Sequence, residues 1–252
     1  MSIAIALDGP AGAGKSSIAR RAAKALGYIY VDTGALYRTV GLAAMRNNVE
    51  PKPSAELEQL LASIRVELTF NETGEQIVLL DGEDVSGEIR TSEASKMASN
   101  ISAVPAVRAY LLDLQRDMAK TNNVIMDGRD IGTVVLPDAK VKIFLTASPE
   151  ARAQRRYKEM VEKGMDVQYE SVLKDVMERD YNDMHREIAP LKPAEGSITV
   201  DTTELDFEQS IEAIINVINA HDLFILIDLL FIKLTPLSLP TPVYWFFSRT
   251  GR

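Results

Sequence analysis

The sequence predicts an α/β fold in which a five-stranded parallel sheet is flanked by helices. Short apolar runs, typical of buried parallel strands, alternate with longer helical patterns along most of the chain. At residues 64–70 the hydrophobic period changes to strict alternation, and further short strands are expected up to residue 86, which predicts an antiparallel insert. A chain of 252 residues is long enough for one domain with such an excursion.

The first strand and the first helix enclose a glycine-rich loop. Residues 2–8 are a short apolar run, and residues 17–26 are good helix formers that end at Gly27. The loop between them fits the P-loop pattern G-x-x-x-x-G-K-[ST]. In this context the backbone N–H groups surround phosphates, Lys15 reaches the β- and γ-phosphates, and the Ser16 hydroxyl can bind Mg²⁺. The predicted ATP site consists of Gly9, Pro10, Ala11, Gly12, Ala13, Gly14, Lys15, Ser16 and Ser17.

The remaining core elements continue the alternation. The expected strands cover residues 28–31, 124–126, 141–145 and 197–200. The expected helices cover residues 35–47, 54–64, 92–100, 104–121, 167–186 and 207–219, with another that begins at Ser148. There, a serine cap precedes a proline at the first helical position. The ligands of such a sheet are expected at the carboxyl ends of its strands.

The insert is predicted to be a three-stranded meander. Apolar and polar residues alternate over residues 64–70, and further strands are expected at 76–80 and 84–86, with turn sequences between them. Such an insert usually forms a small subdomain. The predicted division is a P-loop core of residues 1–50 and 101–219, an insert of about 51–100, a short helical lid of about 148–165, and a tail of 220–252.

Composition excludes several classes of protein. The 36 acidic and 28 basic residues give a net charge of −8, which argues against nucleic-acid binding. Phosphates must therefore be bound by locally concentrated arginines. The chain has no cysteine, so disulfides and thiolate metal sites are excluded. Its N-terminal apolar run lacks a basic region and is too short for a signal peptide, so we expect a cytoplasmic protein.

Arginines gather on two predicted helix faces. Arg152, Arg155 and Arg156 have i, i+3, i+4 spacing, whereas Arg179, Asp183 and Arg186 have i, i+4, i+7 spacing. Either set alone fits a solvated, salt-bridged surface. Their joint occurrence downstream of a phosphate loop favours an anion-binding site instead.

The sequence offers no obvious general base. Its two histidines form no catalytic or metal-binding cluster, and we expect His185 to be an exposed helical residue. A phosphate monoester needs no base, because its second pKa is near 6 and it is already a dianion at neutral pH. A kinase that acts on a phosphate group therefore depends on positive charge.

Five motifs, in order along the chain, resemble those of the bacterial cytidylate kinase family, and the likeness covers about residues 1–219. They lie at residues 9–16, 32–38, 82–90, 127–133 and 189–191. The resemblance implies transfer of the γ-phosphoryl group of ATP to CMP or dCMP, giving the diphosphate and ADP.

The resemblance also implies roles for individual residues. The acceptor phosphate would be bound by Thr33, Arg38, Arg129 and Arg186. The sugar hydroxyls would be bound by Arg179 and Asp183, and the cytosine edge would be read by Ser99, Arg108 and Asp130. The lid arginines that close over the donor phosphates would be Arg152, Arg155 and Arg156.

Two carboxylates have a physical rationale of their own. The N4 amino group of cytosine can donate to a carboxylate such as Asp130, whereas uracil would present a carbonyl there and leave a buried acceptor unpaired. Asp127 ends a buried strand and is expected to orient Mg²⁺ through water. The alternative for Asp127 is an ion pair with Arg129 or Lys15.

Other functions remain open at this point. The chain could be a P-loop kinase for another small acceptor, with Asp127 as the base, or a nucleotide-binding module without catalysis. We expect a monomer. We also expect little membrane contact, because the apolar run at residues 223–232 is too short to span a membrane and contains Asp228. The tail could dock onto the core, mediate oligomerisation, touch a membrane or be an aberrant extension, and we expect activity without it.

Overall fold

The computed structural model describes residues 2–234, with the backbone alone for residues 222–234. The chain falls into two compact units, Met1–Ile218 and Asn219–Arg252. The first unit contains both sheets and every predicted site residue. The apolar and aromatic residues at 235–252, on which part of the interpretation of the tail depended, lie outside the described residues.

The core is a five-stranded parallel sheet, as predicted, and its strand order is β2-β6-β1-β7-β8. The strands are β1 (Ala4–Asp8), β2 (Ile29–Asp32), β6 (Val124–Gly128), β7 (Val141–Thr146) and β8 (Ile198–Asp201). Asp8 pairs in register with Gly128, and Asp32 with Asp127. This register brings the carboxyl ends of β1, β2 and β6 to one edge of the sheet, where the phosphate loop also begins.

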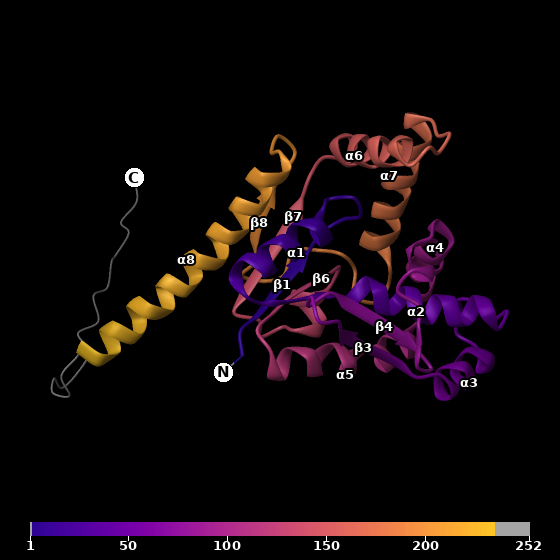
Figure 1. Cartoon of the computed structure of the whole chain (residues 1–252), viewed down its shortest axis with the longest axis horizontal. Coiled ribbons are helices and arrows are strands. Elements are labelled where there is room, and N and C mark those ends of the chain that lie inside the picture. The colour runs from indigo at the N-terminus through magenta and orange to yellow at the C-terminus, as the bar shows by residue number, and fades with distance from the viewer. Residues whose placement is uncertain (1, 235–252) are drawn as a thin grey trace, which may run out of the picture. The chain divides into compact units, whose positions relative to one another are not determined.

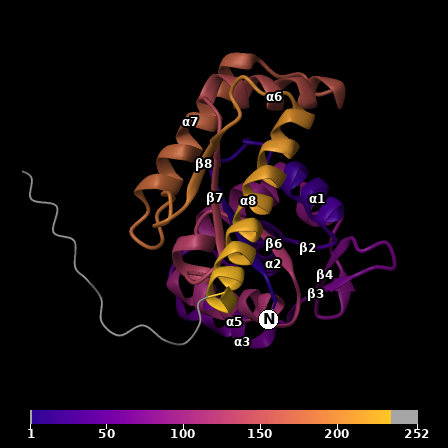
Figure 2. The ribbon, with the colours of Figure 1, turned by 90° about the vertical axis from the view of Figure 1, so that its left-hand side faces the viewer.

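Helices cover both faces of the sheet (Figure 1). They are α1 (Lys15–Leu26), α2 (Thr33–Arg46), α3 (Ala55–Ser63), α4 (Ser92–Ile101), α5 (Pro105–Thr121), α6 (Pro149–Glu162), α7 (Tyr169–His185) and α8 (Phe207–Leu234). Ile18 of α1 and Ile214 of α8 pack against one face of the sheet in one buried cluster. Ala119 of α5 belongs to a second cluster, whose strand residues alternate with those of the first and therefore lie on the opposite face. Helices α6 and α7 lie beyond the carboxyl end of β7 (Figure 2).

The insert has its own antiparallel sheet. Strands β3 (Val66–Phe70), β4 (Gln76–Leu80) and β5 (Glu83–Asp84) form it in that order. Strands β3 and β4 share a buried apolar cluster with α2, α3 and α5. One side chain joins β4 to the core sheet: Gln76 Oε1 accepts from the Asp32 N–H (2.8 Å), and Gln76 Nε2 donates to the Asp32 carbonyl (3.2 Å). The insert therefore contacts the core where α2 begins.

Two differences between the predicted and observed helix boundaries have a clear origin in the sequence. Helix α2 begins at Thr33 rather than residue 35, because the side chain of Asp32 accepts from Ala35 N (3.0 Å) and caps the helix. Helix α8 continues to Leu234 rather than ending at residue 219. The chain contains neither glycine nor proline between Phe207 and Leu234, so no residue type interrupts the helix. Within residues 2–234, no helix combines the length and hydropathy that a membrane span requires.

Candidate active site

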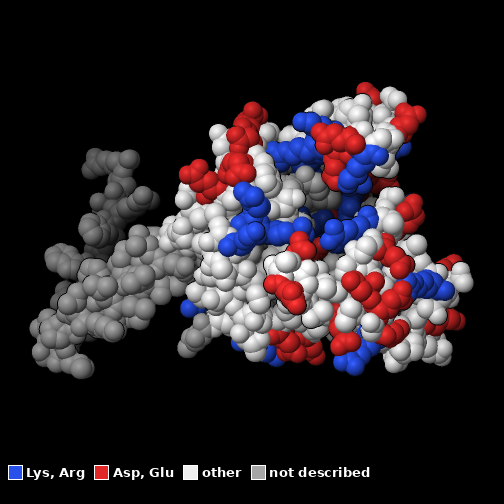
Figure 3. Space-filling model, viewed as in Figure 1, with Lys and Arg blue, Asp and Glu red and all other residues white. Residues whose placement is uncertain are grey.

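A cavity of about 420 Å³ lies at the carboxyl ends of the core strands. Basic side chains gather around a hollow on the face shown in Figure 3. The predicted residues that line the cavity are Ala11, Gly12, Gly14, Lys15, Ser16, Ser17, Thr33, Arg38, Ser99, Arg108, Asp127, Arg129, Asp130, Arg155, Arg156, Arg179, Asp183 and Arg186. Those that do not line it are Gly9, Pro10, Ala13 and Arg152. Arg38, Arg129 and Arg186 therefore share one cavity with Lys15.

The phosphate loop depends on glycine at specific positions. Gly9, Gly12 and Gly14 all have positive φ, and a Cβ on Gly9 would lie only 1.9 Å from the Leu145 carbonyl oxygen. Gly14 is the N-cap of α1 and provides no side-chain cap. The first N–H groups of α1 are therefore left for a bound anion, as in other phosphate-binding helix N-termini.

Lys15 is buried at the floor of this loop. Its Nζ donates to the Pro10 carbonyl (2.8 Å), and its side chain lines the cavity. Burial, together with the nearby Arg129 charge, lowers the pKa of Lys15 to about 7. A bound polyanion would oppose both effects, so phosphate binding favours the charged form of this lysine.

Asp127 lies beside Ser16 at the end of β6. Ser16 Oγ donates to Asp127 Oδ2 (2.7 Å), and the Tyr30 hydroxyl donates to the same oxygen (3.2 Å). Burial, followed by the nearby Asp32 charge, raises the pKa of Asp127 to about 6. Among the described side chains, neither Lys15 nor Arg129 forms an ion pair with Asp127. Asp127 therefore lies beside the Ser16 hydroxyl and not in the alternative ion pair with Lys15 or Arg129.

Each arginine that is expected to bind the acceptor phosphate contacts a carboxylate or carbonyl oxygen of the protein. Arg38 Nη2 lies 2.7 Å from Asp32 Oδ2, Arg129 Nε lies 2.9 Å from Asp183 Oδ2, and Arg186 Nε donates to the Ala189 carbonyl (2.6 Å). These contacts fix the planes of the three guanidinium groups.

Several guanidinium nitrogens of the cavity arginines have no hydrogen-bond partner. Among the described side chains, the buried nitrogens without a hydrogen-bond partner include Arg38 Nε, Arg179 Nε and Arg186 Nη2. Burial, together with the nearby Arg129 charge, lowers the pKa of Arg179 to about 10. Unsatisfied buried donors are rare in native proteins and call for an explanation. An anionic ligand in the cavity supplies one, because it would accept from these donors and neutralise the clustered charge.

The residues expected to read the base also lie together. Arg108 and Asp130 form a buried ion pair, and Arg108 Nη1 donates to the Ser102 carbonyl (3.2 Å). Ser99 lines the same cavity as Arg108 and Asp130. Thr33, expected at the acceptor phosphate, donates its hydroxyl to the Asp127 carbonyl (2.8 Å), so contact with phosphate requires that hydroxyl to rotate.

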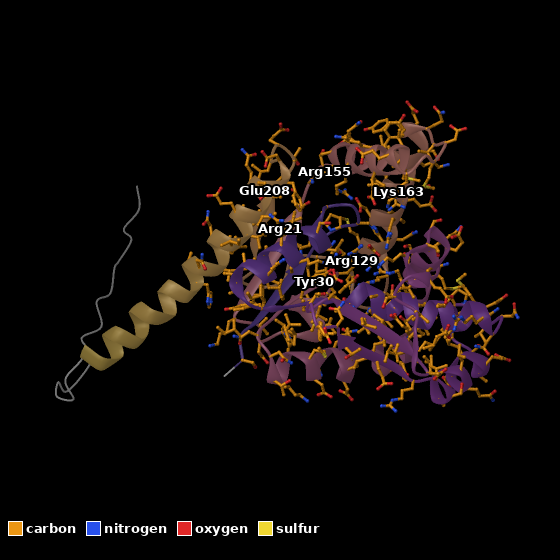
Figure 4. The ribbon with its side chains drawn as sticks, in the orientation of Figure 1. Arg21, Tyr30, Arg129, Arg155, Lys163 and Glu208 are labelled. Atoms are coloured by element: carbon orange, nitrogen blue, oxygen red, sulfur yellow. The ribbon has the colours of Figure 1, made fainter. Side chains whose placement is uncertain are left out.

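The three lid arginines have different environments. Arg155 and Arg156 line the cavity. Arg155 extends from α6 (Figure 4) and donates to the Thr202 carbonyl, just after β8. Arg152 is only 2 % exposed: it donates to the carbonyls of Ala147 and Ala11 (both 2.8 Å) and pairs with Asp180. It therefore joins the phosphate loop to α7 in this structure and does not line the cavity. The i, i+3, i+4 spacing of the three arginines places them on one helix face, but it does not indicate that the first turn of α6 packs against the core.

His185 is exposed, as expected. Its Nδ1 lies 2.8 Å from the Tyr181 carbonyl oxygen, and its ring stacks on that of Tyr181 at a centroid distance of 4.0 Å. It does not line the cavity.

Sequence reasoning missed three residues that support the site. Tyr30 appeared only as part of a strand, although its hydroxyl binds Asp127. Asp32 both caps α2 and pairs with Arg38, and its place before a predicted helix could have indicated the cap. Asp180 pairs with Arg152, and nothing in the local sequence indicates that contact.

The pKa of Lys15 predicts a pH-dependent stability difference. The unfolded chain binds more protons than the folded one between about pH 7 and the ordinary lysine value of 10.5. Burial of Lys15 therefore costs stability at low pH, and this cost declines as the pH rises through that interval. In thermal unfolding without ligands, Lys15→Met is expected to raise the midpoint at pH 6 more than at pH 10. Lys24→Met, at an exposed position of the same helix, is the control; an equal effect of Lys15→Met at both pH values would contradict the assignment.

Comparison with known proteins gives a consistent result. The family model described as cytidylate kinase matches residues 5–220. A cytidylate kinase of Caldicellulosiruptor bescii is 48% identical over 213 residues, which are 84% of this chain and 94% of that protein. One from Thermosipho melanesiensis is 49% identical over 214 residues, covering 85% and 95% of the two chains. One from Streptococcus mutans serotype c is 47% identical over 207 residues, covering 82% and 91%. The chain therefore belongs to the cytidylate kinase family.

Proposed function

We propose that this protein is an ATP-dependent kinase that transfers the γ-phosphoryl group of ATP to CMP or dCMP and releases CDP or dCDP and ADP. The observation that carries the proposal is the convergence of Arg38, Arg129 and Arg186 on the cavity that also contains Lys15. Membership of the cytidylate kinase family supports the choice of substrates.

The proposed reaction brings two anions together. A phosphate oxygen of CMP attacks the γ-phosphorus of ATP, and the bond to the bridging oxygen of ADP breaks. No base is required, because the attacking phosphate is already largely dianionic at neutral pH. The protein lowers the barrier by aligning the two groups and by neutralising charge. Lys15, Arg155 and Arg156 would act on the donor side, and Arg38, Arg129 and Arg186 on the acceptor side.

The residues near Ser16 fit Mg²⁺. Ser16 Oγ and Asp127 Oδ2 are hard oxygen ligands 2.7 Å apart, the type that Mg²⁺ prefers. No group of three or more His, Cys, Asp or Glu side chains among the described residues could hold a metal. The ion would therefore bind with phosphate oxygens and water, through Ser16 directly and Asp127 by way of water. When bound, it would neutralise negative charge on the phosphates.

A specific contact favours a phosphate acceptor over a hydroxyl acceptor. A hydroxyl acceptor would need Asp127 as its base, but Ser16 and Tyr30 both donate to the same oxygen of that carboxylate. The buried nitrogens of Arg38, Arg179 and Arg186 that have no hydrogen-bond partner instead favour an anionic acceptor. A binding module without catalysis would not explain why arginines of the lid line the cavity as well.

A substrate panel tests the proposed acceptor. With saturating ATP, kcat/KM for CMP and dCMP is expected to exceed that for UMP by about 10- to 100-fold, because the uracil carbonyl would face Asp130 and leave buried acceptors unpaired. AMP and small alcohols are expected to be poorer still. Product formation measured with labelled ATP checks this. Equal rates with CMP, UMP and AMP would contradict the base assignment, whereas faster transfer to an alcohol would overturn the proposed acceptor class.

Arg129 tests the acceptor-phosphate role. Arg129→Ala is expected to lower kcat/KM for CMP by about 10²- to 10³-fold, since it removes a preorganised donor to the acceptor phosphate. ATP affinity, measured by calorimetry, should change little. Lys163→Ala is a suitable control, because Lys163 is exposed at the end of α6 and pairs only with Glu159 among the described side chains. Full activity of Arg129→Ala would show that Arg129 does not bind the acceptor.

A further inference from the structure

The segment that follows Arg129 and Asp130 is a single π-helical turn, Ile131–Val135 (η2). The Asp130 carbonyl accepts from Val134 N (2.9 Å) and Val135 N (3.2 Å), and the Ile131 carbonyl accepts from Leu136 N (2.7 Å). Isolated turns of this kind are rare and occur often at functional sites. One turn cannot satisfy the N–H groups at its start or the carbonyl groups at its end. Its geometry therefore depends on partners from elsewhere in the fold.

A carboxylate from β1 binds the start of the turn. Asp8 Oδ1 accepts from Ile131 N (2.8 Å), and Asp8 Oδ2 accepts from Gly132 N (2.7 Å). Asp8 is 3 % exposed and immediately precedes the phosphate loop. It does not line the cavity. Its two contacts therefore connect the phosphate loop to the segment that carries Arg129 and Asp130.

A guanidinium from α5 binds the end of the same turn. Arg116 Nε donates to the Val135 carbonyl (3.0 Å), and Arg116 Nη2 donates to the Val134 carbonyl (3.1 Å). Arg116 does not line the cavity. The negative side chain lies at the amino end of the turn and the positive side chain at its carboxyl end, so each charge complements the local backbone dipole.

We infer that Asp8 and Arg116 are positioning residues that hold Asp130 in the orientation needed to select the acceptor base. Asp130 is the N-cap of η2, and its carbonyl accepts two bonds of the turn, so movement of the turn moves Asp130 directly. Its side chain must also keep its place beside Arg108 and Arg186. Hydrogen-bonding sites need supporting residues because small displacements weaken directional contacts. The inference rests on the proposed role of Asp130 in reading cytosine.

The test compares base selectivity among variants of the full chain. Arg116→Met removes both donors and retains much of the side-chain volume. It is expected to lower the ratio of kcat/KM for CMP to that for UMP by about tenfold, mainly through a higher KM for CMP. The KM for ATP should not change. Lys120→Met is the matched control on the same helix, since Lys120 is exposed and its side chain contacts Asp117.

Two further variants extend the test. Arg116→Lys can still donate to a carbonyl and is expected to recover part of the selectivity. Asp8→Asn is expected to lower selectivity as Arg116→Met does, because the amide can accept from only one of the two N–H groups through its oxygen. If Arg116→Met does not fold, the selectivity of Asp8→Asn decides the question, and a wild-type ratio in that variant would overturn the inference.

Asp130→Asn separates failure of the inference from failure of the proposed function. If Asp130→Asn lowers the CMP-to-UMP ratio and Arg116→Met does not, Asp130 reads the base but Arg116 does not position it, and the inference is wrong. If Asp130→Asn leaves the ratio unchanged, the proposed role of Asp130 is wrong, and the inference fails with it. If Arg116→Met lowers kcat equally with every acceptor and leaves the CMP-to-UMP ratio of kcat/KM unchanged, Arg116 has only a general structural role.

Discussion

Repulsion among buried arginines is the constraint on which this site depends. Arg129, Arg179 and Arg186 line one cavity, and burial lowers the pKa of Arg179 and Arg186. Burial would raise the pKa of Asp183, but Arg129 and Arg179 outweigh it and hold that pKa below its usual value. The carboxylates thus offset part of the repulsion while leaving some guanidinium nitrogens without partners. A phosphate group can neutralise the remainder, so ligand binding and charge compensation are the same event.

The parallel sheet makes this arrangement possible. Strand register brings Asp8, Asp32 and Asp127 to one edge, and each binds a different part of the site. Asp32 orients Arg38, Asp127 accepts from Ser16, and Asp8 supports the turn after Asp130. The same edge carries the glycine loop, whose positive φ angles admit no ordinary side chain. The residues proposed to bind the donor and the acceptor therefore share one sheet edge, whereas the proposed lid arginines come from α6.

Local patterns predicted most of the fold, and motifs predicted the residues of the cavity. The strand and helix sequence, the insert and the loop around Lys15 all follow from hydrophobic period, caps and glycine spacing. Contacts between distant segments were not predictable: the Arg152–Asp180 pair and the Arg116 contacts with η2 depend on tertiary packing that no local pattern encodes. The predicted helix at residues 207–219 was too short, because the likeness to the family ended near residue 219. The residues beyond it still permit a helix, and α8 continues to Leu234.

The central claim is that one cavity binds two phosphate-bearing nucleotides end to end. Calorimetric titration with a molecule that joins adenosine and cytidine through five phosphates tests it most directly. The account predicts one site per chain, affinity at least about 100-fold higher than for ATP alone, and weaker binding by Arg38→Ala, because linking two ligands removes much of the entropic cost of the second. Affinity equal to that of ATP, unaffected by Arg38→Ala, would contradict it.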